Sequence, residues 1–179
     1  MKVTSRSLVF QDSSPGSVRR SSAFPCLAAL SDGRLIISHR VGSVKDSGDG
    51  TIFLSESRDG GQTWEGRGTP FADVWEGVHG ELRYGGITEL EPGHLLAALL
   101  WFDRSDPAAP LFHPETEGLL PARILLSESS DGGRTWGQYR RLDISPMIQP
   151  AITGPILRLS DGLLLCAFET NKEYNDPSP

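Results

Sequence analysis

The sequence predicts an all-β fold made of four-stranded antiparallel units that repeat along the chain, in the manner of β-propeller blades. Two observations predict this fold. First, twenty glycines and thirteen prolines separate short apolar segments, and no long 3.6-residue periodicity is present. Second, SESRDGGQTW (55–64) returns 72 residues later as SESSDGGRTW (127–136), with two of its ten residues changed. A β-sandwich also has short strands, but the repeated order of the same turns favours blades.

The first unit is expected over residues 23–83, after a lead-in of residues 1–22. Its apolar segments alternate with turn residues and polar loops, which typically bound strands. In chain order, the expected parts are the strand FPCLAAL (24–30), the turn SDGR (31–34), the strand LIISHRV (35–41), the loop GSVKDSGDG (42–50), the strand TIFLSES (51–57) and the repeated turn (57–64).

The second unit is expected over residues 84–150, and a partial third unit over 151–179. Both follow the order of the first. The second contains GITEL (86–90), EPGH (91–94), LLAALLWF (95–102), a long loop (103–121), ARILLSES (122–129), the second repeated turn (129–136) and a short fourth strand, GQYRRLD (137–143). The third contains GPILRL (154–159), SDGL (160–163) and LLCAFE (164–169). About two and a half blades are therefore predicted.

Composition and charge narrow the classes of function. Hydrophobic residues make up 37% of the chain and charged residues 22%, which is typical of a globular domain. The net charge of −6 argues against a nucleic-acid partner. No apolar run approaches the roughly 20 residues that span a bilayer, and no secretory signal precedes the first unit, so we expect a cytoplasmic protein without a membrane partner. Cys26 and Cys166 predict buried free thiols, and no spacing predicts a metal site or a cofactor.

The repeated turn has a structural explanation that needs no substrate. Its aspartate can accept hydrogen bonds from turn amides, and its glycines permit a positive φ. Its serine can bond back to the turn, and its tryptophan supplies an apolar body to pack between sheets. A structural role is therefore predicted for Ser57, Asp59, Gly61, Trp64, Ser129, Asp131, Gly133 and Trp136.

This phrase is the Asp-box. With the blade pattern, the chain resembles the sialidase (neuraminidase) superfamily from about residue 22 to about residue 170. The resemblance implies a six-bladed propeller and a glycoside hydrolase that acts on a terminal sugar of a glycan. The remaining blades are expected from the rest of a longer chain or from partner chains. Asp-boxes also occur in propellers without glycosidase activity, so a non-catalytic propeller that binds a glycan or a protein is the alternative.

Ionisable residues of the three units gather at one end of the predicted blades. In an antiparallel meander, the first-to-second and third-to-fourth turns share one end, and the second-to-third loops share the other. Because loops on a rigid scaffold carry function, a ligand is expected at the end of the second-to-third loops. The ionisable residues that end the second strands, or follow them, are Arg40, Asp46, Asp49, Asp103, Arg104 and Glu169.

The resemblance gives several of these residues roles in glycoside hydrolysis. In the family, a first-blade arginine is followed six residues later by the acid/base aspartate, and Arg40 and Asp46 match that spacing. Arg40 would then contact the substrate, while Asp46 would protonate the leaving glycosidic oxygen and later activate water. Asp49 is the rival for the acid role. Glu169 is a candidate for the glutamate that activates the family's tyrosine nucleophile.

The second blade is expected to contribute further contacts to the sugar. Asp103 resembles the second-blade aspartate that contacts substrate in the family, and Arg104 follows it directly. The loop 103–121 contains four prolines and could form a semi-rigid rim over the site. Two roles, stacking on a sugar ring or packing against the neighbouring blade, are open for the aromatic residues Trp101, Phe112 and His113.

The sequence departs from the family pattern at two points. The family carries Arg-Ile-Pro at the start of the first strand, and its arginine helps to clamp the carboxylate of sialic acid. The matching residues here are Ala23, Phe24 and Pro25. The family's nucleophile belongs to a late blade, which none of the three tyrosines matches (Tyr84, Tyr139 and Tyr174). The sugar and the nucleophile are therefore open.

Overall fold

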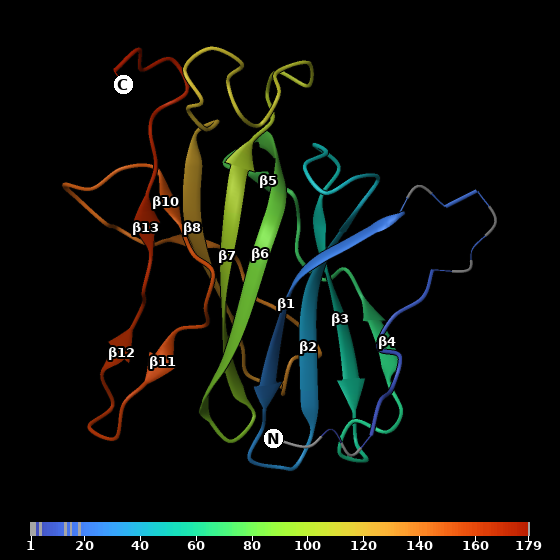
Figure 1. Ribbon diagram of the computed structural model, residues 1–179. Coiled ribbons are helices and arrows are strands. Elements are labelled where there is room, and N and C mark those ends of the chain that lie inside the picture. Colours follow the sequence, from blue (N-terminus) through green and yellow to red (C-terminus); the bar gives the residue numbers. More distant parts are fainter. Residues whose placement is uncertain (1–2, 4, 13, 15, 18, 179) are drawn as a thin grey trace.

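A computed structural model describes residues 3, 5–12, 14, 16–17 and 19–178. Within these residues the fold is all-β, with thirteen strands and no helix (Figure 1). The strands form two complete antiparallel sheets, and two short strand pairs begin a third. The predicted all-β propeller architecture is therefore confirmed. Within the described residues there is also no helix that could span a bilayer.

The first blade contains four strands in sequential order. They are β1 (Ser21–Ala29), β2 (Leu35–Gly42), β3 (Thr51–Ser57) and β4 (Glu65–Gly68). The first strand starts three residues before the predicted FPCLAAL segment, and its register with β2 shifts between Ala23 and Cys26. Phe24 lies within this bulge at φ 54°, which is uncommon for a residue other than glycine. The bulge therefore changes the direction of the first residues of β1.

The second blade contains five strands in sequential order. They are β5 (Val74–Trp75), β6 (Val78–Glu91), β7 (His94–Asp103), β8 (Ala122–Ser129) and β9 (Arg140–Arg141). The first long strand, β6, begins at Val78 rather than at the predicted Gly86, so it extends into the range assigned to the first unit. The predicted fourth strand is reduced to two residues. The early part of β6 was missed because its sequence, VHGELRYGG, is not an apolar run.

The third unit contains two chain segments, each broken into two short strands. β10 (Pro150–Ala151) pairs with β13 (Glu169–Thr170), and β11 (Leu157–Arg158) pairs with β12 (Leu164–Leu165). Both pairs are antiparallel, so the chain runs up and down once, as the first two strands of a blade do. Figure 1 shows them beside the second blade, on the side away from the first.

The second blade has an apolar layer on each face. The layer shared with the first blade includes Ile36, Ile52 and Leu54 opposite Leu95, Leu99 and Trp101. The layer shared with the third unit includes Leu96, Leu100, Phe102, Ile124, Ile152 and Ile156. Because neighbours cover both faces, β7 is apolar without alternation, and eight of its ten residues are buried. Cys26 and Cys166 are free thiols at intermediate exposure.

Turns and loops separate to the two ends of the blades, as the meander argument predicts. In Figure 1 the turns 31–34, 91–94 and 160–163 lie at the lower end, together with the repeated turn after β3. The loops that follow β2 and β7 lie at the upper end. We call this upper end the open end. It is where the predicted site residues of the first two blades lie.

Each repeated turn is closed by its own aspartate. Asp59 Oδ1 accepts hydrogen bonds from the backbone N–H of Gln62 and of Thr63, both at 2.9 Å, and from Ser57 Oγ at 2.8 Å. Thr63 Oγ1 donates to Asp59 Oδ2 at 2.6 Å. The second turn repeats the same bonds around Asp131. Two successive glycines in each turn have positive φ values, which glycine adopts without the steric penalty that other residues incur.

Substitution of Asp59 by asparagine is expected to lower the thermal unfolding midpoint by a few degrees near neutral pH. Hydrogen bonds from Thr63 and Ser57 lower the pKa of Asp59 from 3.8 to about 2. The stabilisation from the ionised carboxylate is therefore complete above the ordinary pKa and is lost as the pH falls through the folded-state value. The difference in melting midpoint between the native chain and Asp59→Asn should thus shrink toward pH 2. A difference that does not change with pH would contradict this.

The hairpin formed by β11 and β12 leaves a row of leucines uncovered. The exposed fraction is 57% for Leu157, 61% for Leu163, 44% for Leu164 and 51% for Leu165. Exposed leucines of this kind favour association, and Leu157 and Leu165 are paired across the hairpin and so share one face. We expect the 179-residue chain to self-associate as its concentration rises, and Leu163→Lys with Leu165→Lys to suppress this, as measured by light scattering. Leu27→Lys, at an equally exposed leucine of the first blade, is the matched control. Equal suppression by the control would contradict this role for the hairpin.

Candidate functional site

The open end of the first two blades contains a buried carboxylate surrounded by arginines. Glu81, on β6, has no exposed surface. Its Oε2 lies 3.1 Å from Arg40 Nη2, and its Oε1 lies 3.2 Å from Arg104 Nη2. Arg83 Nη1 lies 3.9 Å from the same Oε1. Because a buried charge is costly unless it is paired, Glu81 and the three arginines form one mutually dependent group. We call these four residues the Glu81 cluster.

Arg40 is the organiser of the loop that follows its own strand. Its guanidinium donates to the carbonyl of Val44 at 2.9 Å and to the carbonyl of Ser47, and its side chain has no exposed surface. A Cβ at Gly50 would overlap this guanidinium, so the loop can close over Arg40 only with glycine there. The buried position gives Arg40 a loop-holding role in this chain. Its predicted contact with substrate stays a prediction.

Asp46 is the exposed carboxylate beside the Glu81 cluster. It lies in the loop held by Arg40, its side chain is 44% exposed, and it forms an ion pair with Arg83 Nη2. Partial burial acts to raise the pKa of Asp46, but the hydrogen bond and charge of Arg83 outweigh it, and the charges of Lys45 and Arg40 add to this. The pKa of Asp46 is therefore below its ordinary value of 3.8, and the resting carboxyl group is ionised near neutral pH.

Asp49, the rival for the acid role, closes the same loop from the other side. Its two carboxylate oxygens accept the backbone N–H of Ser43, at 3.0 and 3.1 Å. Burial acts to raise the pKa of Asp49, but hydrogen bonds from Ser47 and Ser43 lower it below 3.8. Its acceptor positions are used by the loop, so Asp49 is held more closely by its own backbone than Asp46 is.

The second blade contributes a buried arginine and a turn aspartate to this end. Arg104 donates to the carbonyl of Ala109 at 3.0 Å and to the carbonyl of Asp46 at 3.4 Å, so it links the loops of the two blades. Asp103 accepts the backbone N–H of Ser105 at 2.8 Å, as in an Asx-turn. Arg104 thus joins the Glu81 cluster, whereas Asp103 caps the start of its loop.

Glu169 is not part of this group. It is exposed on β13, whose partner is β10 in the third unit. No hydrogen bond or ion pair of its side chain is found within the described residues. The structure therefore brings Arg40, Asp46, Asp49 and Arg104 together, places Asp103 next to Arg104, and leaves Glu169 on another unit.

Two residues of the group, Glu81 and Arg83, were missed by the sequence analysis. They stand two residues apart in GELRYGG, which spans the predicted boundary between the first unit (23–83) and the second (84–150). Residues two apart on a strand share one face, and opposite charges on one buried face indicate an ion-pair cluster. Recognition of a strand that begins at Val78 would have provided this signal.

Comparison with solved structures adds the fold family. A Hadza microbial sialidase superposes with a TM-score of 0.64 and 25% identity, over 82% of this chain and 32% of the sialidase. Trypanosoma rangeli sialidase in complex with sialic acid superposes with a TM-score of 0.54 and 13% identity, over 79% of this chain and 25% of that one. This chain has the sialidase-type propeller fold. It spans about a third or less of these two proteins.

Two further comparisons gave no match. No family model matches the sequence, and no curated protein matches it. The relationship to sialidase-type propellers is therefore carried by the three-dimensional arrangement of the strands and by the predicted motifs.

The tyrosines of this sialidase-type chain do not have the properties of an activated nucleophile. Tyr84 is buried, and desolvation, followed by its contact with Cys26, raises the pKa of its hydroxyl far above 10. Burial, followed by the charge of Asp73, also raises the pKa of Tyr139, whose hydroxyl donates to the carbonyl of Ala72 at 2.6 Å. Tyr174 packs edge-on against His113 at 4.9 Å between ring centroids. An activated phenol would need its pKa lowered instead.

The aromatic residues considered for sugar stacking have other contacts. Trp101 is 2% exposed, donates from Nε1 to the carbonyl of Asp73 at 2.9 Å, and belongs to the layer between the blades. His113 packs against Tyr174 of the third unit. Phe112 alone is half exposed. Packing against the neighbouring unit therefore explains two of the three.

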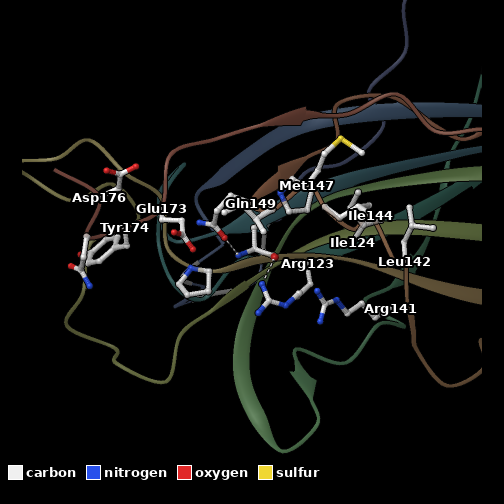
Figure 2. Close-up of a pocket in the computed structure, with 15 residues that line it drawn as sticks. Arg123, Ile124, Arg141, Leu142, Ile144, Met147, Gln149, Glu173, Tyr174 and Asp176 are labelled. Atoms are coloured by element: carbon white, nitrogen blue, oxygen red, sulfur yellow. Dashed lines mark hydrogen bonds between the residues drawn. The ribbon is translucent and has the colours of Figure 1, made fainter. Parts of the chain in front are cut away.

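The hollow in Figure 2 has a volume of about 670 Å³ and lies between the second blade and the third unit. Arg123 and Arg141 line it, as do Met147 and Tyr174. Gln149 fixes its wall, because Gln149 Nε2 donates to the carbonyl of Leu119 at 2.8 Å and Gln149 Oε1 accepts from the backbone of Ala122. None of the predicted site residues lines this hollow. Among the residues the structure describes, no acidic, histidine or cysteine cluster could hold a metal.

Substitution of Glu81 by glutamine is expected to destabilise the chain by about 3 kcal/mol or more, because it leaves three buried guanidinium groups without their common counter-charge. Urea denaturation monitored by tryptophan fluorescence would measure this. Glu65→Gln is the matched control, since Glu65 is 70% exposed and its pair with Arg67 should contribute at most about 0.5 kcal/mol. Equal effects of the two substitutions would contradict the central role of Glu81.

Proposed function

We propose that this chain carries the acid/base part of a glycoside hydrolase site, which acts on a terminal sugar of a glycan, with Asp46 as the acid/base residue. The observation that carries the proposal is the placement of Asp46. It is a half-exposed carboxylate at the open end of a sialidase-type scaffold, in a loop held by buried arginines. A positioned carboxyl group is what acid/base catalysis of glycosidic cleavage requires.

In the proposed reaction, the proton on the Asp46 carboxyl moves to the glycosidic oxygen. The bond between that oxygen and the anomeric carbon breaks at the same time, and its electron pair stays on the oxygen. The electron-deficient anomeric carbon accepts an oxygen nucleophile. Water then attacks the anomeric carbon while the Asp46 carboxylate takes its proton, and the bond to the first oxygen nucleophile breaks with its electron pair returning to that nucleophile. Arg104 and Arg40 act by holding the two loops that position Asp46.

Other parts of the site would come from outside the residues described. The chain spans 32% and 25% of the two sialidases above, so a complete ring of blades would need further blades from the rest of a longer chain or from partner chains. We infer that the nucleophile lies there, since the tyrosines of this chain are buried or in contact with other residues. Glu169, exposed on the third unit, remains the candidate on this chain for the activating glutamate.

A non-catalytic propeller that binds a glycan is the second candidate. The ion pair between Asp46 and Arg83 favours it, because an aspartate held ionised by arginine has no proton to donate but is a good acceptor for sugar hydroxyl groups. Alanine at position 23, where the family carries an arginine, points the same way. Catalysis and binding make different predictions for Asp46→Asn.

A panel of fluorogenic glycosides, assayed with the protein together with the further blades that the proposal requires, would test the proposal. We expect release of the fluorophore from at least one glycoside and a fall of about 100-fold or more in kcat for Asp46→Asn, since removal of a general acid has this order of effect. Asp49→Asn tests the rival, and Asp161→Asn, in a turn at the opposite end, is the control. Glycan binding without any turnover would overturn the enzymatic proposal in favour of the binding module.

A further inference from the structure

Arg83 lies between the exposed carboxylate of Asp46 and the buried carboxylate of Glu81. Its Nη2 bonds to Asp46, and its Nη1 lies 3.9 Å from Glu81 Oε1. Nη1 is buried and has no hydrogen-bond partner among the described residues. One guanidinium therefore connects the candidate acid to the interior of the Glu81 cluster.

The position of Arg83 is set by the fold rather than by Asp46. Its side chain extends from β6, is 13% exposed, and its guanidinium carbon lies 5.0 Å from the centre of the Phe24 ring. Phe24 belongs to the bulge in β1, so the first blade supplies the ring and the second blade supplies the cation. With Phe24 and Glu81 beside it, Arg83 is held in place, whereas Asp46 sits on a more exposed loop.

Arg83 is the cation that bonds directly to the Asp46 carboxylate. The other charged groups that face Asp46 act less directly. Lys45 and Arg40 act through their charges, and Arg104 reaches the backbone carbonyl of Asp46 rather than its carboxylate. Glu81 is the buried anion on the far side of Arg83, and Asp49 bonds to Ser43. Partial burial therefore acts to raise the pKa of Asp46, and among the groups that lower the pKa its hydrogen bond to Arg83 has the largest effect.

We propose that Arg83 is a positioning residue that sets the pH range in which Asp46 can donate a proton, through the direct ion pair between their side chains. The proposal rests on the acid/base role proposed for Asp46. Arg83 holds Asp46 in its ionised form, and a general acid must be protonated before it can act. The basic limb of the pH–rate profile then lies at low pH, and loss of Arg83 moves this limb upward.

The sign follows from the charges around Asp46. Without Arg83, partial burial still opposes ionisation of Asp46, and only the less direct charges of Lys45 and Arg40 favour it. The pKa of Asp46 should therefore rise in Arg83→Gln. An aspartate beside an arginine typically has its pKa lowered by about one to three units, so the titration midpoint should rise by about one pH unit or more. Arg83→Lys keeps a cation next to Phe24 and should keep the midpoint low.

The primary experiment is a pH titration of the Asp46 carboxyl carbon by NMR on the 179-residue chain, with the resonance assigned from its absence in Asp46→Asn. We expect the native chain and Arg83→Lys to share a low midpoint, and Arg83→Gln to titrate about one pH unit or more higher. Arg140→Gln is the matched control, because Arg140 is 65% exposed and pairs with Glu128 on the outer edge of the second blade. It makes the same change in net charge and should leave the Asp46 midpoint where it is.

The outcomes separate this proposal from the proposed function. An unchanged Asp46 midpoint in a folded Arg83→Gln overturns the role of Arg83, whatever the enzymatic activity. If Arg83→Gln fails to fold, Arg83→Lys decides, since a midpoint raised despite the retained charge would equally contradict the proposal. Where a glycoside is hydrolysed, the basic limb of kcat should move with the NMR midpoint. A midpoint that moves in Arg83→Gln, without hydrolysis of any glycoside, would contradict the proposed enzymatic function and would still support the role of Arg83.

Discussion

Burial of one carboxylate, that of Glu81, links the first two blades at the open end. Its pairing with Arg40 and Arg104 brings together one arginine from each blade, and each of these arginines in turn holds the loop that follows its strand. A charge with no exposed surface is tolerated only when it is paired. Movement of either loop would therefore expose the Glu81 carboxylate or remove one of its arginine partners. The loop that contains the exposed Asp46 lies on the surface, but the buried side chains of Arg40 and Arg104 hold it in place.

The charged side chains have different roles at the two ends of the blades. At the closed end, each repeated turn satisfies its own amides through Asp59 or Asp131, so these carboxylates are engaged mainly by their own turns. At the open end, the arginines are shared between blades, and Asp46 keeps exposed surface. The strand order of a meander by itself places the repeated turns and the site loops at opposite ends of the blades. The chemistry can thus vary at the open end without disturbing the turns that define the blades.

The sequence predicted the features that depend on neighbouring residues. The bonds within each repeated turn join residues no more than four apart, so a ten-residue phrase contains all of them. Apolar runs likewise predicted the central strands, because β7 is buried on both faces. The start of β6 escaped prediction because its buried residues include Glu81 and several glycines, and hydrophobic patterns do not detect a buried ion pair. Glu81 and Arg40 are 41 positions apart, and only the fold brings them together.

The buried surroundings of Arg83 also decide between two explanations of the Asp46–Arg83 pair. A surface ion pair contributes little and can exchange freely with water. Arg83 is only 13% exposed and is flanked by Phe24 and Glu81, so its charge is poorly screened where it meets Asp46. The pair therefore controls the charge of Asp46 more strongly than a surface contact would.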